Sequence, residues 1–240
     1  MASKRFKGKL CVYCSSRPST TGDHVFARQF FMESARQNLP QAPACETCNN
    51  EKSKLEHYLA TVLPFGGRHV QAAETLTTLV PGRLAKNLNL ARDLNAGRGH
   101  VWHMENGVMR LAMVIPIDSE QATSLFGMIA RALASLHFGV TLLPEHASGA
   151  IFLSSTGQEY YSRVFAMNAA RRVHCDLGRG AVRYMGAQSP TTPELTVWRM
   201  KFYGGISMSG DPRIPGGVSS EIGAATGSRH AVDILTDQDK

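Results

Sequence analysis

Apolar residues recur at helical spacing in three parts of the chain. The first predicted helix runs from the second of two cysteine pairs to Pro64, and the second covers residues 71–96 with an interruption at Pro81-Gly82. The third is strongly amphipathic, opens at Asp118 and ends at Gly139. The apolar positions that carry the first and third helices are Leu55, Leu59 and Val62 or Leu63, and then Leu125, Ile129, Leu133 and Leu136.

Short apolar runs predict strands, most of them in the second half of the chain. They cover residues 24–26, 107–117, 150–153, 164–167, 171–176, 182–185 and 195–204. The pattern of the second half therefore predicts an α+β domain, in which one amphipathic helix packs against a mainly antiparallel sheet. Beyond Gly204 the chain is rich in Gly and Ser and poor in large apolar residues, which is typical of a flexible tail.

These patterns predict four segments. An N-terminal module covers residues 1–68 and a helical connector residues 69–98. An α+β domain of unknown role covers residues 99–205, and the predicted tail covers residues 206–240. With 240 residues, 43% of them apolar, the chain is long enough for one ordinary domain plus a small module.

Neither a membrane span nor a secretory signal is predicted. No apolar stretch reaches about 18 residues, and the basic start MASKRFKGKL has no apolar run behind it. We therefore expect a cytoplasmic protein with no membrane partner.

The charge of the chain is concentrated in the N-terminal module. The formal net charge is +7, and residues 1–70 hold ten Lys and Arg against five Asp and Glu, so +5 of the excess lies there. A basic segment of this kind favours a polyanionic partner, bound mainly through its backbone phosphates.

Four of the five cysteines form two identical pairs, Cys11-Val-Tyr-Cys14 and Cys45-Glu-Thr-Cys48. Two CxxC pairs supply the four thiolates of a tetrahedral zinc site, and a site without an open position is structural. The alternatives are four buried cysteines without a metal, or one redox-active pair. The isolated Cys175 reads as a small, half-buried apolar residue.

The segment from Cys11 to about Leu63 resembles the HNH nuclease family, in the branch whose ββα-metal core is held by two CxxC knuckles. The resemblance covers about a quarter of the chain and rests on CVYC, GDHVFARQFF, NLPQAPACETCNN and EKSKLEHYL. It implies a general base at His24, the middle family asparagine at Asn38 and the third family position, often His, at Asn49. It also implies that Asp23 and Asn49 hold one catalytic divalent cation.

This implied assignment is consistent with the chemistry of phosphodiester hydrolysis. Water has to lose a proton near neutral pH, and His is the side chain whose ordinary pKa suits that task. A carboxylate and an amide oxygen are hard ligands of the kind that Mg²⁺ or Mn²⁺ prefers, and such an ion stabilises charge on the phosphoryl group. Asn38 would hold the imidazole or the phosphate by hydrogen bonding.

Other polar residues of the module have both a functional and an ordinary interpretation. Asn50 competes with Asn49 for its role, and His57 is either a further contact or an exposed helix residue. Several basic side chains either contact phosphates or are simply solvated: Lys4, Arg5, Lys7, Lys9, Arg17, Arg28, Lys52 and Lys54.

The sequence therefore favours a metal-dependent HNH-type endonuclease acting on DNA, with RNA as a further possible substrate. Its expected cofactors are one structural Zn²⁺ and one catalytic Mg²⁺ or Mn²⁺. The alternatives are a catalytically inactive zinc-knuckle protein that binds nucleic acid or acts as an adaptor, and a structural protein that uses the zinc module for protein contacts. A homodimer would explain cutting of both strands, although no motif requires one.

Overall fold

The computed structural model describes residues 5–105, 107–206, 208–209, 218–219 and 221–237. The α-helices are α1 (Glu46–Val62), α2 (Val70–Thr78), α3 (Val80–Lys86), α4 (Leu88–Gly97), α5 (Ser119–Phe138), α6 (Ser155–Met167) and α7 (Arg229–Thr236). Three short 3₁₀ helices are η1 (Arg28–Phe30), η2 (Glu33–Ala35) and η3 (Leu63–Gly66). No described helix is both long and apolar enough to cross a membrane.

The strands of the described residues form one five-stranded sheet and three two-stranded ribbons. The sheet has the order β5 (Ala147–Leu153), β11 (Glu221–Gly227), β8 (Thr196–Phe202), β7 (Val182–Gln188) and β6 (Arg172–Leu177), and all its pairs are antiparallel. The ribbons pair β1 (Thr21–His24) with β2 (Gln41–Ala44), β3 (Gly99–Glu105) with β4 (Val108–Val114), and β9 (Met208–Ser209) with β10 (Val218–Ser219). The chain is therefore mixed α+β with an antiparallel sheet, as predicted.

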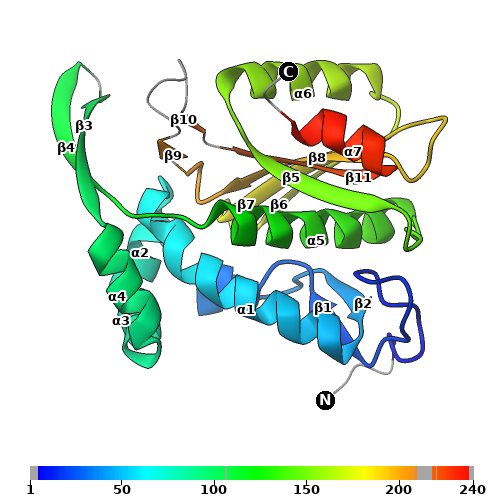
Figure 1. Ribbon diagram of the computed structural model, residues 1–240, viewed down its shortest axis with the longest axis horizontal. Coiled ribbons are helices and arrows are strands. Elements are labelled where there is room, and N and C mark those ends of the chain that lie inside the picture. The colour runs from blue at the N-terminus through cyan, green and yellow to red at the C-terminus, as the bar shows by residue number, and fades with distance from the viewer. Residues whose placement is uncertain (1–4, 106, 207, 210–217, 220, 238–240) are drawn as a thin grey trace.

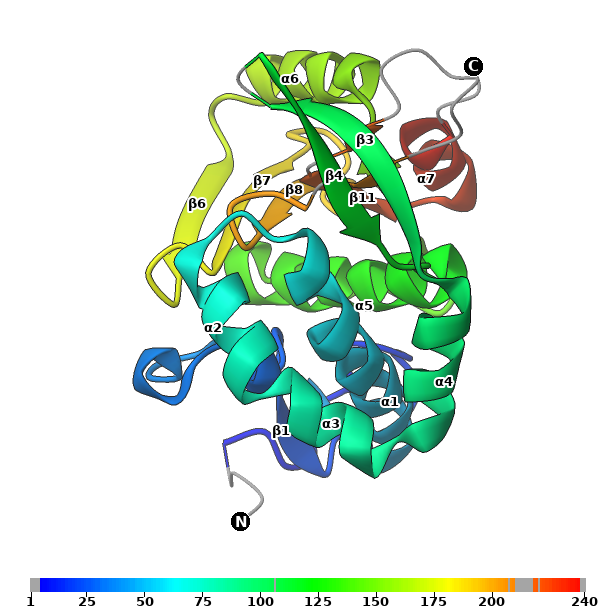
Figure 2. The ribbon, with the colours of Figure 1, turned by 90° about the vertical axis from the view of Figure 1, so that its left-hand side faces the viewer.

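The elements stack in layers (Figure 1). Helices α6 and α7 lie on one face of the sheet and α5 lies on the other, while β1, β2 and α1 lie beyond α5. Figure 2 shows α2, α3 and α4 running past α1 and leading to the β3–β4 ribbon.

Helix α5 forms as its sequence predicts. Asp118 caps it by accepting a hydrogen bond from the Gln121 backbone, and Gly139 ends it in the left-handed conformation with φ of 66°. Leu125, Ile129 and Leu133 are fully buried, whereas Leu136 is 41% exposed because it lies in the last turn, at the edge of the packed face.

The predicted strand at residues 164–167 is wrong, because these residues are the last turn of α6. The stretch VFAM is too short for its periodicity to separate strand from helix. Over the longer stretch Tyr161, Val164 and Phe165 follow helical spacing, and all three are buried. Ser154 is the N-cap residue of this helix, and its hydroxyl accepts a hydrogen bond from the Gly157 backbone N–H.

The predicted flexible tail is also wrong for the residues that the structure describes. Strand β11 lies between β5 and β8, and α7 follows it. Its small residues are needed by the packing, because a Cβ at Gly223 would lie 2.7 Å from Leu153 and Tyr161 side-chain atoms. The run of Gly and Ala residues is typical of a flexible segment, but here its small side chains allow a central strand to pack against α6. The prediction for residues 207, 210–217, 220 and 238–240 lies outside the described residues.

The connector and the first strand differ from their predicted limits. Pro81 and Gly82 lie in the first turn of α3, where proline is tolerated, and the helix breaks fall at Leu79 and Asn87. Strand β1 ends at His24, and Val25 and Phe26 beyond it are fully buried.

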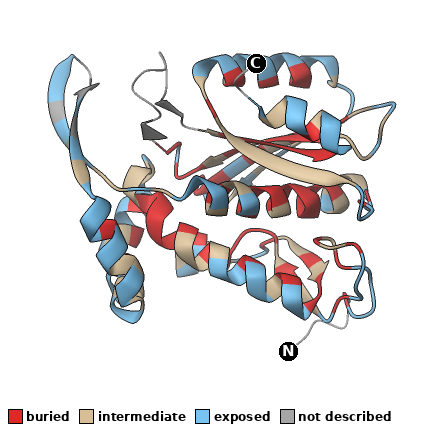
Figure 3. Cartoon of the chain, in the orientation of Figure 1, coloured by how far each residue is buried: buried red, intermediate tan, exposed pale blue. Residues whose placement is uncertain are grey.

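The N-terminal module shares its hydrophobic core with the sheet. Phe26 stacks on Tyr184 with ring centroids 5.3 Å apart, and Phe30 meets Phe202 edge-on at 5.2 Å. The boundary predicted near residue 68 therefore does not separate two cores (Figure 3). Zinc binding and packing of the sheet are expected to stabilise the same unit.

Candidate functional site

The first 62 residues contain a two-stranded ribbon followed by a helix, and this order brings the two cysteine pairs together. Strand β1 pairs with β2 in the register Thr21↔Ala44 to His24↔Gln41. Cys45 follows β2 directly and is the N-cap residue of α1, so Cys48 lies one turn further along the helix. The first pair lies in the turn that precedes β1, and its Val12 backbone N–H donates to Pro43 of β2 at 3.0 Å.

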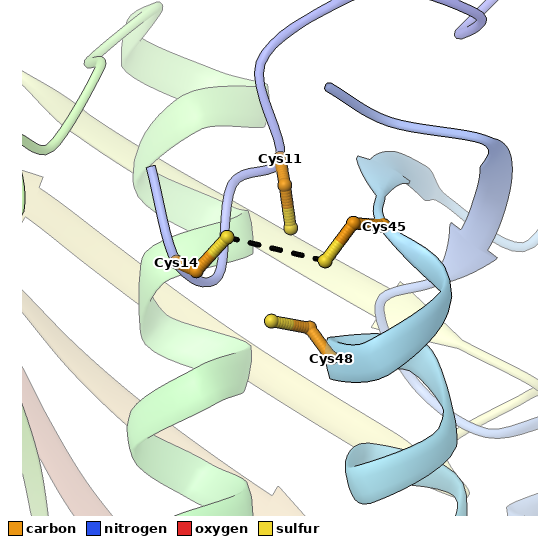
Figure 4. A group of neighbouring side chains, drawn as sticks. All are labelled: Cys11, Cys14, Cys45 and Cys48. Carbon is orange, nitrogen blue, oxygen red and sulfur yellow. Dashed lines mark hydrogen bonds between the residues drawn. The ribbon is translucent and has the colours of Figure 1, made fainter. Parts of the chain in front are cut away.

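The four cysteines form a compact cluster (Figure 4). The Sγ atoms of Cys11, Cys14, Cys45 and Cys48 all lie within 4.8 Å of one another, and those of Cys14 and Cys45 are 3.9 Å apart. A tetrahedral zinc ion with Zn–S bonds of about 2.3 Å needs sulfur atoms roughly 3.8 Å apart. The donor set and spacing thus fit one structural zinc ion, as the sequence predicts.

The surroundings of the sulfur atoms also favour a cation. Burial raises the pKa of Cys11 and, more strongly, that of Cys48, where the neighbouring thiols add to the effect. At Cys14 burial opposes ionisation, but hydrogen bonds from Ser16 and Arg17 outweigh it and lower the pKa to about 5. Four crowded thiols ionise together only when a positive ion lies among them, which a divalent metal provides.

Two arginines hold the cluster from outside. Arg17, expected as a possible phosphate contact, donates to Thr47 at 3.0 Å and to the Cys48 sulfur at 3.7 Å. The buried Arg131 of α5 donates to the Val12 carbonyl at 3.2 Å and to the Ser15 hydroxyl at 3.0 Å. Arg131 was not predicted as part of the site, because a charged residue on the buried face of a helix has no partner visible in sequence.

His24 lies at the end of β1, and its Nε2 is 3.2 Å from the amide nitrogen of Gln41 on β2. Burial lowers the pKa of His24, and the positive charges of Arg28 and Lys52 act in the same direction, against the nearby Asp23 carboxylate. The lowered pKa favours the neutral imidazole, in which one nitrogen is a donor and the other an acceptor. Gln41 fixes its ring and was not singled out from sequence.

Lys52 does not lie on a phosphate-binding surface, which corrects the prediction for this residue. Its side chain is 0% exposed, and its ammonium donates to the His24 carbonyl at 2.8 Å, to Asp23 Oδ2 at 2.9 Å and to Glu56 Oε1. The Tyr13 hydroxyl also donates to Asp23 Oδ2, at 2.5 Å. We call Tyr13, Asp23, Lys52 and Glu56 the buried ion cluster.

The buried ion cluster changes the role of Asp23. Its side chain is about 10% exposed, and its Oδ2 already accepts from Lys52 and Tyr13. Within the described residues, no hydrogen bond or ion pair joins Asn38, Asn49 or Asn50 to Asp23 or His24. Asn49 is half-buried in the first turn of α1, Asn50 is exposed beside it, and Asn38 is exposed with a left-handed φ of 55°.

The remaining predicted site residues lie on the surface of the module. Arg28 and Lys54 are exposed, as are Arg5, Lys7 and Lys9, while Lys4 lies outside the described residues. Arg5 and Lys9 both lie over the ring of the buried Phe6, at 5.3 Å and 5.9 Å from its centroid. Lys54 and the half-buried His57 line a cavity of about 540 Å³ between α1, α4 and the start of α5.

Glu56 gives the chain a testable pH dependence. Burial raises the pKa of Glu56 to about 7, and Asp23 adds to this against the opposing charge of Lys52. Because the folded chain binds this proton more tightly than the unfolded chain, the contribution of Glu56 to stability is fully present below about pH 4.5 and is lost as pH rises to about 7. The loss amounts to at most about 3 kcal/mol. In urea unfolding between pH 5 and 8, the free energy of unfolding of Glu56→Gln should rise relative to that of the native chain as pH rises. Parallel stability curves for the two chains would contradict the assignment.

No family model, curated protein or solved structure matches this chain. The features of the chain that bear on its function are the cysteine cluster, His24 and the buried ion cluster.

Proposed function

We propose that this protein is a metal-dependent endonuclease of the HNH type that hydrolyses DNA phosphodiester bonds, with His24 as the general base. The observation that carries the proposal is the position of His24 at the end of β1, where it pairs with Gln41 of β2 in the ribbon that precedes α1. The order of two antiparallel strands and a helix, held by a four-cysteine cluster, also supports it because the resemblance implies this arrangement.

In the proposed reaction His24 accepts a proton from the water that attacks the phosphorus atom. The Gln41 amide lies 3.2 Å from Nε2. For Nδ1 to accept the proton, the oxygen of this amide would have to accept a hydrogen bond from the Nε2–H. Lys52 supports the role of His24 by donating a hydrogen bond to the His24 carbonyl at 2.8 Å, which holds the end of β1 in place. Arg28 is placed to attract the phosphate, because its charge already influences the pKa of His24.

A divalent ion bound beside His24 would stabilise the charge on the phosphoryl oxygens and the leaving 3′ oxygen. Asp23 and Asn49 are the residues proposed to hold it. Because Lys52 and Tyr13 both contact Asp23 Oδ2, the ligand oxygen would have to be Oδ1. A carboxylate oxygen and an amide oxygen leave most of the coordination sphere to water and substrate, as Mg²⁺ sites usually do.

His24→Ala is expected to abolish cleavage of supercoiled plasmid in the presence of Mg²⁺ or Mn²⁺. Loss of a positioned general base typically costs a factor of about 10² to 10⁴ in rate. The matched control is His230→Ala, because His230 is an exposed histidine on α7. Both variants should keep one zinc per chain, and undiminished cleavage by His24→Ala would refute the role of His24.

The second candidate is a zinc-knuckle protein that binds nucleic acid without cutting it. It is favoured by the engagement of Asp23 with Lys52, which leaves little of the carboxylate for a catalytic ion. Salt-sensitive binding to DNA or RNA, without cleavage across a panel of divalent metals, would favour this candidate over the nuclease.

A further inference from the structure

The β3–β4 ribbon projects from the body of the protein. Figures 1 and 2 show it leaving α4, standing beside the five-stranded sheet, and returning to α5. Within the described part of the chain, neither strand makes extensive contact with any element except the other. Its base is held firmly, because Gly97 packs closely on Pro116 and the Asp118 backbone N–H donates to the Tyr58 hydroxyl at 2.7 Å.

One face of this ribbon carries a stripe of exposed apolar side chains. Met109, Leu111 and Met113 alternate along β4 and so share a face, and Trp102 of β3 pairs directly with Leu111. Their exposed fractions are 53%, 53%, 49% and 65% in the same order. We call these four residues the apolar stripe. Val108, also exposed, lies on the opposite face.

The apolar stripe is large for a surface that stays in water. At about 200 Å² for each fully exposed large side chain, the stripe presents roughly 400 Å² of apolar surface. The most extended exposed patches of monomeric proteins are of this size and commonly mark binding sites. An apolar stripe cannot neutralise phosphates, so nucleic acid is a poor partner for it.

We propose that the apolar stripe is a homodimer interface, covered by the same stripe of a second copy of this chain. Packing about a two-fold axis places identical residues against each other, which suits an apolar surface. The described residues of this face include one ionisable side chain, His100, which pairs with Met113 at the end of the stripe. Stable interfaces bury about 800 Å² per partner. The stripe supplies about half of that area, so the dimer is expected to be weak and reversible. The proposal does not depend on nuclease activity.

The test is the oligomeric state of the full chain by sedimentation velocity and light scattering at pH 8, from about 1 to 100 μM. The native chain is expected to be a dimer at the upper concentrations. Leu111→Glu should be a monomer throughout, because the two-fold axis places two carboxylates in one apolar interface. Val108→Glu is the matched control on the same strand and should dimerise like the native chain.

Trp102 gives a second readout. Of the two tryptophans, Trp198 is fully buried and Trp102 is 65% exposed, so dilution through the transition should shift the Trp102 emission to longer wavelength. Dimers of the native chain and Val108→Glu with monomers of Leu111→Glu support the proposal. A monomeric native chain, a Leu111→Glu dimer, or loss of the dimer in Val108→Glu each overturns it, as does a native monomer that binds neutral lipid vesicles.

Discussion

Cys45→Ser is expected to lose its bound zinc and to unfold the N-terminal part of the chain. Cys45 supplies one of the four sulfur atoms and also begins α1, so its loss opens the metal site at the point where β2 meets the helix. Structural zinc contributes about 10–16 kcal/mol in small zinc-binding peptides, which is as large as the whole stability of many domains. Chelation of the native protein should have the same effect.

The effect is expected to reach beyond the metal site, because Phe26 and Phe30 pack against Tyr184 and Phe202 of the sheet. Zinc content per chain, far-ultraviolet circular dichroism and the urea midpoint measure the change. Cys175→Ser is the matched control, since Cys175 lies on β6 and outside the cluster. Unchanged zinc content in Cys45→Ser would contradict the four-cysteine site.

The cysteine cluster could be predicted from sequence because its information is local. Two CxxC pairs specify four ligands whatever the fold around them, and the sulfur atoms do lie together. The same holds for α5, where Asp118, the apolar spacing and Gly139 all lie within one helix. The cysteine pairs and helix α5 could therefore be predicted, because each is specified by residues that lie close together in the sequence.

The place of β11 could not be predicted, because its evidence lies in distant residues. Gly223 is small because Tyr161 and Leu153 pack on it, and both are far away in sequence. Viewed alone, a segment of Gly, Ala and Ser has too little apolar surface to favour order. The sheet provides that surface, so the segment becomes a central strand.

The buried ion cluster falls between these cases. Lys52 and Glu56 are four residues apart on α1 and on the same face as the buried Cys48 and Leu59, so their pairing could have been expected. Their meeting with Asp23 depends on how α1 packs on β1, which the sequence does not disclose. As a result, Lys52 was assigned to phosphate binding although its ammonium has three protein acceptors.

Lys52→Met is expected to destabilise the protein by about 3–5 kcal/mol, the usual cost of removing one partner of a buried ion pair. Met matches the aliphatic part of the Lys side chain but leaves Asp23 without a cation and the His24 carbonyl without a donor. Glu56 can relieve part of the charge by taking up a proton, since burial already raises its pKa to about 7. Asp23 is buried and keeps only the Tyr13 hydroxyl of its two donors, so most of the cost persists.

Lys54→Met is the matched control, because it removes the same charge two residues away on the exposed face of α1. Its stability should change by less than about 0.5 kcal/mol, and urea unfolding at pH 7 compares the two variants. The double variant Lys52→Met/Glu56→Gln should cost less than the two single changes together, because residues that share one ion cluster are not independent. Equal stability of Lys52→Met and Lys54→Met would show that the Lys52 ammonium is solvated, and Lys52 would then return to the set of candidate phosphate contacts.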